Sequence, residues 1–292
     1  TTSTGSTVSG VRNATPATSS VATINIVGNT VKGSNNKGVG AWYGITNTGI
    51  TTATGTININ SNILDSNRIE CTSGGTNFKM LENTGTSATL NMIGNTITRN
   101  SKVASLTAAA EFILLNNAPT SVSNVNIQNN IIDKDSILVQ STNAGNVTYS
   151  GIKSINGANG STINVNGNTI QRLFLKDINS TYVGALRGYY STVSNNPTEN
   201  IYNNKISKLV ISAAALSSGT HTLYGIHSAG NVLSTTAVKN IYGNAIDTLY
   251  VRNNNDATPS YNSSVAAIYS LTGLTVNIYK NKIAHIIPFG SN

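Results

Sequence analysis

A short pattern of apolar and polar positions recurs along the whole chain. It reads apolar–Asn–apolar–x–x–Asn–x–apolar, and two copies begin with a charged residue in place of the first apolar one. The eight copies lie at residues 24–31, 57–64, 90–97, 125–132, 163–170, 199–206, 239–246 and 276–283. Successive copies begin 33 to 40 residues apart. A repeat of this length without helical periodicity predicts a solenoid of stacked strands.

The two Asn columns of the repeat are expected to face in opposite directions. The first Asn stands between two apolar residues, so strand alternation turns it outward. The position before the second Asn is mostly Gly or Asn, which adopt a left-handed conformation at low cost and bend the chain. The second Asn then points into the bend, where its amide can bond to the same residue of the next turn. This predicts an internal ladder of Asn29, Asn62, Asn95, Asn130, Asn168, Asn204, Asn244 and Asn281.

A third strand is expected between successive copies, in segments such as 42–47, 78–83 and 223–228. Strand, left-handed residue, inward Asn and second strand together resemble the parallel β-helix repeat of pectate-lyase-like proteins. The resemblance covers about residues 20–290 and implies an all-β fold. The expected architecture is a right-handed, single-stranded parallel β-helix of about eight rungs, with three strands per rung and an internal Asn ladder. The resemblance says little about activity, because this fold serves many functions.

The continuity of the repeat indicates a single domain. Residues 21–292 are expected to form the β-helix, and residues 1–20, rich in Ser, Thr and Gly, a leader or the remnant of a preceding rung. Solenoids need covered ends to avoid association edge to edge, and no capping segment is evident. The ends are therefore expected to contact neighbouring copies or the rest of a longer chain. The alternative is that residues 1–20 and 286–292 form loops that cap them.

One column of the repeat changes character halfway along the chain. Three residues beyond the last apolar position, the first four copies have the polar residues Ser34, Asn67, Asn100 and Asp135. The last four copies have Leu173, Leu209, Leu249 and Ile286. The second half is therefore expected to have a wider apolar cross-section, as in two fused repeat blocks.

The amino-acid composition limits the classes of protein to which this chain can belong. Only 10% of residues are charged and 38% are hydrophobic, which excludes a disordered polar chain. No apolar run reaches the roughly 18 residues that a membrane span needs. The single Cys71 permits no internal disulfide. Because polar, cysteine-poor β-solenoids are typical of secreted bacterial proteins, and the Tyr-rich phrases resemble surface proteins of Bacteroidota, we expect a secreted or cell-surface bacterial protein.

Two outward columns are candidate binding surfaces. Four consecutive rungs present a basic stripe of Arg99, Lys134, Arg172 and Lys208. Such a stripe, with a net charge of +8, matches an anionic polymer such as uronate polysaccharide, lipopolysaccharide or nucleic acid. The alternative is that these residues keep a stalk soluble and protect its sheet edges. The last three rungs present a tyrosine row of Tyr202, Tyr242 and Tyr279. This row suits sugar stacking, or simply stabilises the sheet by packing.

Catalytic chemistry is not indicated by the acidic and histidine residues. Glycoside hydrolysis needs two carboxylates roughly 5–10 Å apart, but Asp65, Asp133 and Asp247 share a column without occupying adjacent rungs. His221, His227 and His285 lack the spacing of metal ligands. We therefore expect no catalytic residues, metal or cofactor, although a lyase that uses Lys or Arg as its base is left open. Ser136 and Thr248 stand in short motifs that resemble the O-glycosylation motif of Bacteroidota.

These observations favour a non-enzymatic structural or adhesive segment, a stalk or fibre, of a secreted or cell-surface protein. Two alternatives follow from the same residues. The basic stripe and the tyrosine row fit a module that binds or cleaves polysaccharide. The open ends fit a self-assembling extracellular filament subunit.

Overall fold

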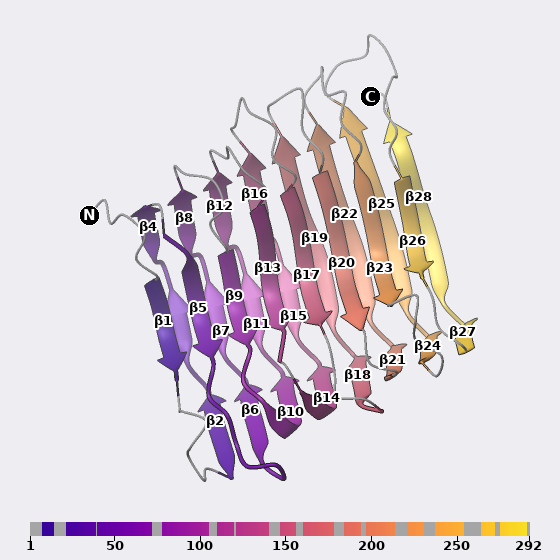
Figure 1. The fold of residues 1–292 in the computed structure, drawn as a ribbon. Coiled ribbons are helices and arrows are strands. Elements are labelled where there is room, and N and C mark those ends of the chain that lie inside the picture. Colours follow the sequence, from indigo (N-terminus) through magenta and orange to yellow (C-terminus); the bar gives the residue numbers. More distant parts are fainter. Residues whose placement is uncertain are drawn as a thin grey trace.

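A computed structural model describes residues 8–14, 22–38, 40–71, 78–104, 110–119, 121–139, 147–155, 160–177, 184–193, 197–213, 221–230, 237–253, 264–271 and 275–290. Within these ranges every regular element is a β-strand. All the strand pairs are parallel, and each strand pairs with its counterpart in the preceding and following turns. The described chain therefore forms a parallel β-solenoid, as predicted (Figure 1).

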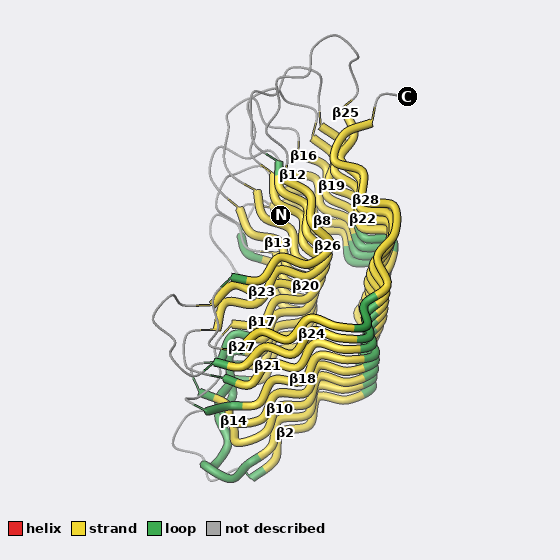
Figure 2. The backbone as a smooth tube through the Cα atoms, turned by 90° about the vertical axis from the view of Figure 1, so that its right-hand side faces the viewer, coloured by secondary structure: helices red, strands yellow, loops and turns green. Residues whose placement is uncertain are grey.

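The turns stack into three sheets, which confirms the expectation of three strands per rung. Sheet A consists of β1 (Val8–Asn13), β5 (Trp42–Asn47), β9 (Phe78–Asn83), β13 (Ala110–Asn117), β17 (Val147–Ile155), β20 (Gly184–Val193), β23 (Thr222–Gly230) and β26 (Ser264–Ser270). Sheet B consists of β2 (Thr23–Val27), β6 (Thr56–Asn60), β10 (Ser87–Ile93), β14 (Val122–Gln128), β18 (Thr162–Asn166), β21 (Thr198–Tyr202), β24 (Val238–Tyr242) and β27 (Thr275–Tyr279). In Figure 2 the strands of each sheet lie behind one another, so that the stack is seen nearly end-on.

Sheet C follows sheet B in every turn, and its strands change along the chain. In the first four turns it is built from pairs of short strands: β3 (Thr30–Lys32) and β4 (Asn35–Gly38), β7 (Ile63–Asp65) and β8 (Arg68–Cys71), β11 (Thr96–Thr98) and β12 (Ser101–Ala104), β15 (Ile131–Asp133) and β16 (Ser136–Val139). In the later turns each pair is replaced by one long strand: β19 (Thr169–Asp177), β22 (Lys205–Ala213), β25 (Ala245–Asn253) and β28 (Lys282–Gly290). The sequence analysis did not predict the second short strand.

The number of fully enclosed turns is smaller than the number of sequence phrases. Sheet B has eight strands, and β2 and β27 are its edges, so six strands have a neighbour on both sides. Ile278 on the edge strand β27 is 50% exposed, whereas its counterpart Ile241 on β24 is fully buried. The solenoid thus has about six turns covered on both sides, rather than the eight rungs expected.

Each turn bends at a left-handed residue between sheets B and C. Every residue of the predicted bend column has a positive φ, including the four that are not glycine: Ser61, Asn129, Asn203 and Lys280. A second left-handed residue follows five positions later in each turn, within sheet C. This second column contains Gly33, Ser66, Arg99, Lys134, Arg172, Lys208, Thr248 and His285. The second bend separates the short strands of sheet C and was not predicted.

The predicted internal Asn ladder is present and fully hydrogen-bonded. Asn168 is buried, and its Nδ2 donates to Asn204 Oδ1 at 2.9 Å and to the Ile127 carbonyl at 2.9 Å. Its Oδ1 accepts from the backbone N and the Nδ2 of Asn130, at 3.0 and 2.9 Å. Side-chain bonds of the same kind run from Asn29 to Asn281. Because each amide from Asn62 to Asn244 uses all its donors and acceptors, this polar column is buried without the cost of unpaired groups.

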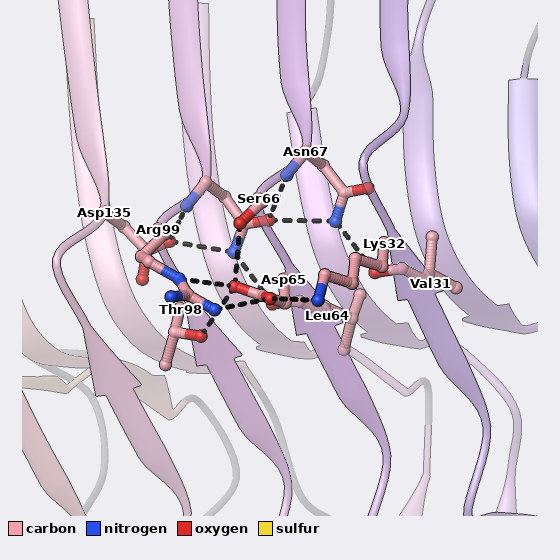
Figure 3. Close-up of polar contacts among 10 residues, drawn as sticks. Val31, Lys32, Leu64, Asp65, Ser66, Asn67, Thr98, Arg99 and Asp135 are labelled. Atoms are coloured by element: carbon pink, nitrogen blue, oxygen red, sulfur yellow. Dashed lines mark hydrogen bonds and ion pairs between the residues drawn. The ribbon is translucent and has the colours of Figure 1, made fainter.

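A second internal ladder occupies the bend of sheet C in the first four turns. Asn67 Nδ2 donates to Asn100 Oδ1 at 2.9 Å, and Asn100 Nδ2 donates to Asp135 Oδ1 at 2.9 Å (Figure 3). In the following turns the same inward column contains Leu173 and Leu209, which are fully buried. The predicted shift to a more apolar second half is therefore present. The inward direction of the polar residues in this column, and the ladder that they form, were not predicted.

The outward Asn column forms a third ladder. Strand alternation placed these residues outside, and they are half-buried or exposed. Asn58 Nδ2 donates to Asn25 Oδ1 at 2.8 Å, and equivalent bonds continue from turn to turn as far as Asn277. The remaining interior is apolar, and Trp42 stacks on Phe78 with their ring centroids 5.5 Å apart. Among the described residues, no helix is long and apolar enough to cross a membrane.

Candidate functional site

The basic stripe lies at the second left-handed bend, on the outer face of sheet C. Arg99, Lys134, Arg172 and Lys208 have φ angles between 54° and 61°. The turns of sheet C stack in register, so the four side chains emerge at one position of consecutive turns. The structure therefore brings these residues together as the sequence predicted.

Two members of the stripe are neutralised by carboxylates of the preceding turn. Arg99 forms a bidentate pair with Asp65, with Nε–Oδ1 and Nη2–Oδ2 distances of 2.8 and 2.6 Å (Figure 3). Arg172 pairs with Asp133 in the same way. The hydrogen bond from Arg99 lowers the pKa of Asp65 to about 2. Since Asp65 and Asp133 balance the two arginines, only Lys134 and Lys208 leave the stripe with positive charge not paired to a described carboxylate.

The tyrosine row is a stack of parallel rings on the outer face of sheet B. Tyr202 and Tyr242 have ring centroids 5.0 Å apart with planes 2° apart, and Tyr242 and Tyr279 repeat this at 5.0 Å and 3°. Tyr279 is 46% exposed. This geometry serves packing between turns, and the outer ring edges face solvent. Whether the row binds sugar stays a prediction.

The two expected glycosylation sites lie on sheet C. Ser136 begins β16 and is half-buried. Thr248 occupies the left-handed bend with a φ of 55°, and its Oγ1 donates to Asp247 Oδ1 at 3.2 Å. Both hydroxyls belong to the solvent side of the sheet, and their modification stays a prediction.

A cluster of aromatic and charged side chains that was not predicted lies on the outer face of sheet A. His227 of β23 lies at its centre, with ring centroids 4.9 Å from Tyr190, 4.9 Å from Tyr224 and 5.1 Å from Tyr269. Tyr224 and Tyr269 are stacked, with centroids 4.9 Å apart. The guanidinium of Arg187 lies 4.2 Å from the centre of the Tyr190 ring. These five residues come from three adjacent strands, β20, β23 and β26.

Several polar atoms of this cluster lack a hydrogen-bond partner. His227 is only 8% exposed, and neither of its ring nitrogens has one. Nε of Arg187 is also buried and without a partner. Burial, together with the charges of Arg187 and Lys239, lowers the pKa of His227 to about 4, so the imidazole is neutral at pH 7. An aromatic surface with unused donors and acceptors is suited to a polar ligand.

Neighbouring charges on the same face are already paired. Lys153 forms an ion pair with Glu111, and Lys79 with Glu82. Arg187 forms no ion pair with a described carboxylate, so its charge is available to an anionic group of a ligand. Strand alternation alone would place Tyr224 and His227 on opposite faces, because they are three positions apart, and the same holds for Arg187 and Tyr190. Predicting this face would also have required the register between turns of unequal length.

The two charged exceptions in the repeated phrase form a buried polar cluster between sheets A and B. Glu199 accepts hydrogen bonds from Tyr189 Oη at 2.7 Å and Ser228 Oγ at 2.5 Å. Lys239 Nζ donates to the carbonyl oxygens of Ser228 and Leu271, at 2.9 and 2.6 Å. Burial lowers the pKa of Lys239, while Glu199 opposes this shift. Because these groups are enclosed and satisfied by one another, they hold adjacent turns together rather than face a ligand.

No group of three or more His, Cys, Asp or Glu residues that could hold a metal ion occurs within the described ranges. Comparisons with models of known families, with curated proteins and with solved structures found no match to this chain. The architecture and the residues described above are therefore the basis for the functional proposal.

Proposed function

We propose that this chain is a non-enzymatic structural or adhesive segment, a stalk or fibre, of a secreted or cell-surface bacterial protein. The observation that supports this most directly is the internal ladder, which links every turn from Asn29 to Asn281 through hydrogen bonds along the axis. An uninterrupted column of such bonds resists bending and stretching. The resemblance of the repeat to right-handed, pectate-lyase-like β-helices and to Bacteroidota surface proteins supports the extracellular setting.

A rigid segment should keep its two ends at one fixed separation, and spin labels can measure this. Ser61 and Lys280 occupy the same exposed bend position, six turns apart in sheet B. Strands about 4.8 Å apart place these backbone positions roughly 29 Å from each other. A variant with C71S, S61C and K280C should give one narrow distance distribution close to this value by double electron–electron resonance. A broad or multimodal distribution would contradict the stalk proposal.

A second candidate function, polysaccharide binding, is supported by the cluster around His227. Tyr269, which is 37% exposed on the edge strand β26, offers an aromatic surface to a pyranose ring, and the charge of Arg187 suits a uronate carboxylate. Screening the protein against neutral and acidic glycans, with product analysis of every hit, tests this candidate. Polysaccharide binding is supported if R187Q abolishes the binding of acidic glycans while R12Q, at the N-terminal edge of the same sheet, does not. Cleavage of any glycan would overturn the non-enzymatic proposal. If no glycan binds, polysaccharide binding is rejected and the stalk remains the proposed function.

A further inference from the structure

Two hollows lie next to each other on the outer face of sheet C, and β19 and β22 line both. The first, of about 400 Å³, is lined by Arg172 of β19, by Lys205 and Lys208 of β22, and by Asp247 of β25. The second, of about 330 Å³, lies further along the same strands. Its lining is almost wholly apolar and includes Leu138, Phe174 and Val210, with Lys176 among its residues.

The first hollow has an excess of positive charge. Arg172 is paired with Asp133, and Asp247 Oδ1 lies 2.7 Å from His285 Nδ1. That contact with His285 lowers the pKa of Asp247, which is therefore ionised at neutral pH. Lys205 and Lys208 are exposed and form no ion pair with a described carboxylate. With Arg172 paired to Asp133, the two lysines outweigh the single carboxylate of Asp247, and the surplus positive charge favours an anion.

The second hollow exposes apolar surface beside that charge. Phe174 is 42% exposed, and Val210 pairs with it directly on the next strand. Ile137 and Leu175, which are buried, also contribute to its lining. In the first three turns the Phe174 column instead contains Asn35, Arg68 and Ser101. Among the described residues, this column is therefore apolar only in the second half of the solenoid, where Phe174 pairs with Val210 and Val210 with Tyr250.

The spacing of the two hollows fits one ligand. Phe174 lies two positions after Arg172, and Val210 lies two positions after Lys208, which is about 7 Å along a strand. We propose that this surface binds a single-chain phospholipid-like amphiphile, with its phosphate ester at Lys205 and Lys208 and its alkyl chain over Phe174 and Val210. The cations bind the head group, and removal of the alkyl chain from water adds to the affinity. This inference does not depend on the proposed stalk or glycan functions.

Isothermal titration calorimetry with three probes tests the site: octyl phosphate below its micelle concentration, ethyl phosphate and octyl glucoside. Octyl phosphate should bind at least tenfold more tightly than either of the others, because only it occupies both hollows. The proposal is wrong if octyl phosphate binds no more tightly than ethyl phosphate, or if octyl glucoside binds equally well.

Two double variants and a matched control locate the binding. K205Q/K208Q and F174S/V210S should each weaken octyl phosphate binding at least tenfold, while their thermal denaturation stays close to that of the wild type. The control K32Q/K37Q removes the same charge from the first turn of sheet C, where the apolar hollow is absent, and should change affinity less than twofold. If the control weakened octyl phosphate binding equally, the effect would be due to net charge alone and the proposed site would be wrong.

Discussion

Replacing Asn168 with leucine tests whether the internal ladder stabilises the solenoid. The side chain makes four hydrogen bonds, all of them lost in N168L: two to the Asn130 donors, one to Asn204 Oδ1 and one to the Ile127 carbonyl. Leucine has nearly the same size and shape, so little cavity or overpacking is introduced. The variant therefore isolates the polar contribution.

The expected loss of unfolding free energy follows from the buried polar groups that are left without partners in N168L. The backbone N–H of Asn130 and one of its side-chain N–H groups become buried donors without acceptors, whereas Asn204 Oδ1 keeps the backbone N–H of Asn168 at 3.1 Å. Each orphaned donor costs about 1–3 kcal/mol. Burial of the leucine side chain returns about 1.5–3 kcal/mol. With two such donors, we expect a net destabilisation of about 2 kcal/mol.

Urea denaturation of N168L, compared with N164L, measures this loss. Asn164 stands four residues earlier in the outward ladder, where it is half-buried and makes side-chain bonds of 3.1 and 3.0 Å to Asn126 and Asn200. Water can replace these bonds, so N164L should cost less than about 1 kcal/mol. Faster hydrogen exchange of the Asn130 amide should accompany N168L alone. Equal midpoints for the two variants would refute the assignment of stability to the inward column.

Three further predictions concern the bends of sheet C. Burial raises the pKa of Asp135 well above its usual value, so the wild type should lose stability relative to D135N as the pH rises above about 4. Denaturation midpoints of the two proteins that change in parallel across pH 3–8 would contradict this. Arg99 lowers the pKa of Asp65 to about 2, so the wild type should lose the stability of this pair as the pH falls from about 4 towards 2. The variant R99Q should show a smaller loss over that range in acid titrations followed by circular dichroism. Lys134 has a φ of 61° and an exposed side chain, so K134G should raise the unfolding free energy by up to about 1 kcal/mol, and a decrease would argue against a left-handed bend there.

The sequence predicted those features that depend on local chemistry repeated in every turn. The bend before the inward Asn was foreseeable because Gly28, Gly94 and Asn129 belong to the residue types that accept a positive φ easily. The inward direction of Asn168 then followed from the loss of strand alternation. These conclusions need no knowledge of how distant segments meet.

The second bend could not be predicted because most of its residues are not of types that are typical of left-handed turns. Arg99, Lys134 and Arg172 belong to residue types that are uncommon in the left-handed region, so they gave no signal of a turn. Without that bend, the inward direction of Asn67 and Asn100 could not be derived. The contacts of His227 depend on register across loops of unequal length, which the repeat does not specify. The candidate sites were therefore harder to predict than the fold.

The bonding of the ladder amides has a consequence for how such a chain can change in length. Each inner ladder Asn bonds only to the turns before and after it, through the neighbouring Asn residues and one backbone carbonyl. A gene duplication that adds one complete turn therefore supplies both the missing donors and the missing acceptors. Deletion of a whole turn leaves the flanking amides equally able to bond to each other. The length of the protein can thus evolve in steps of one turn while its interior chemistry stays the same.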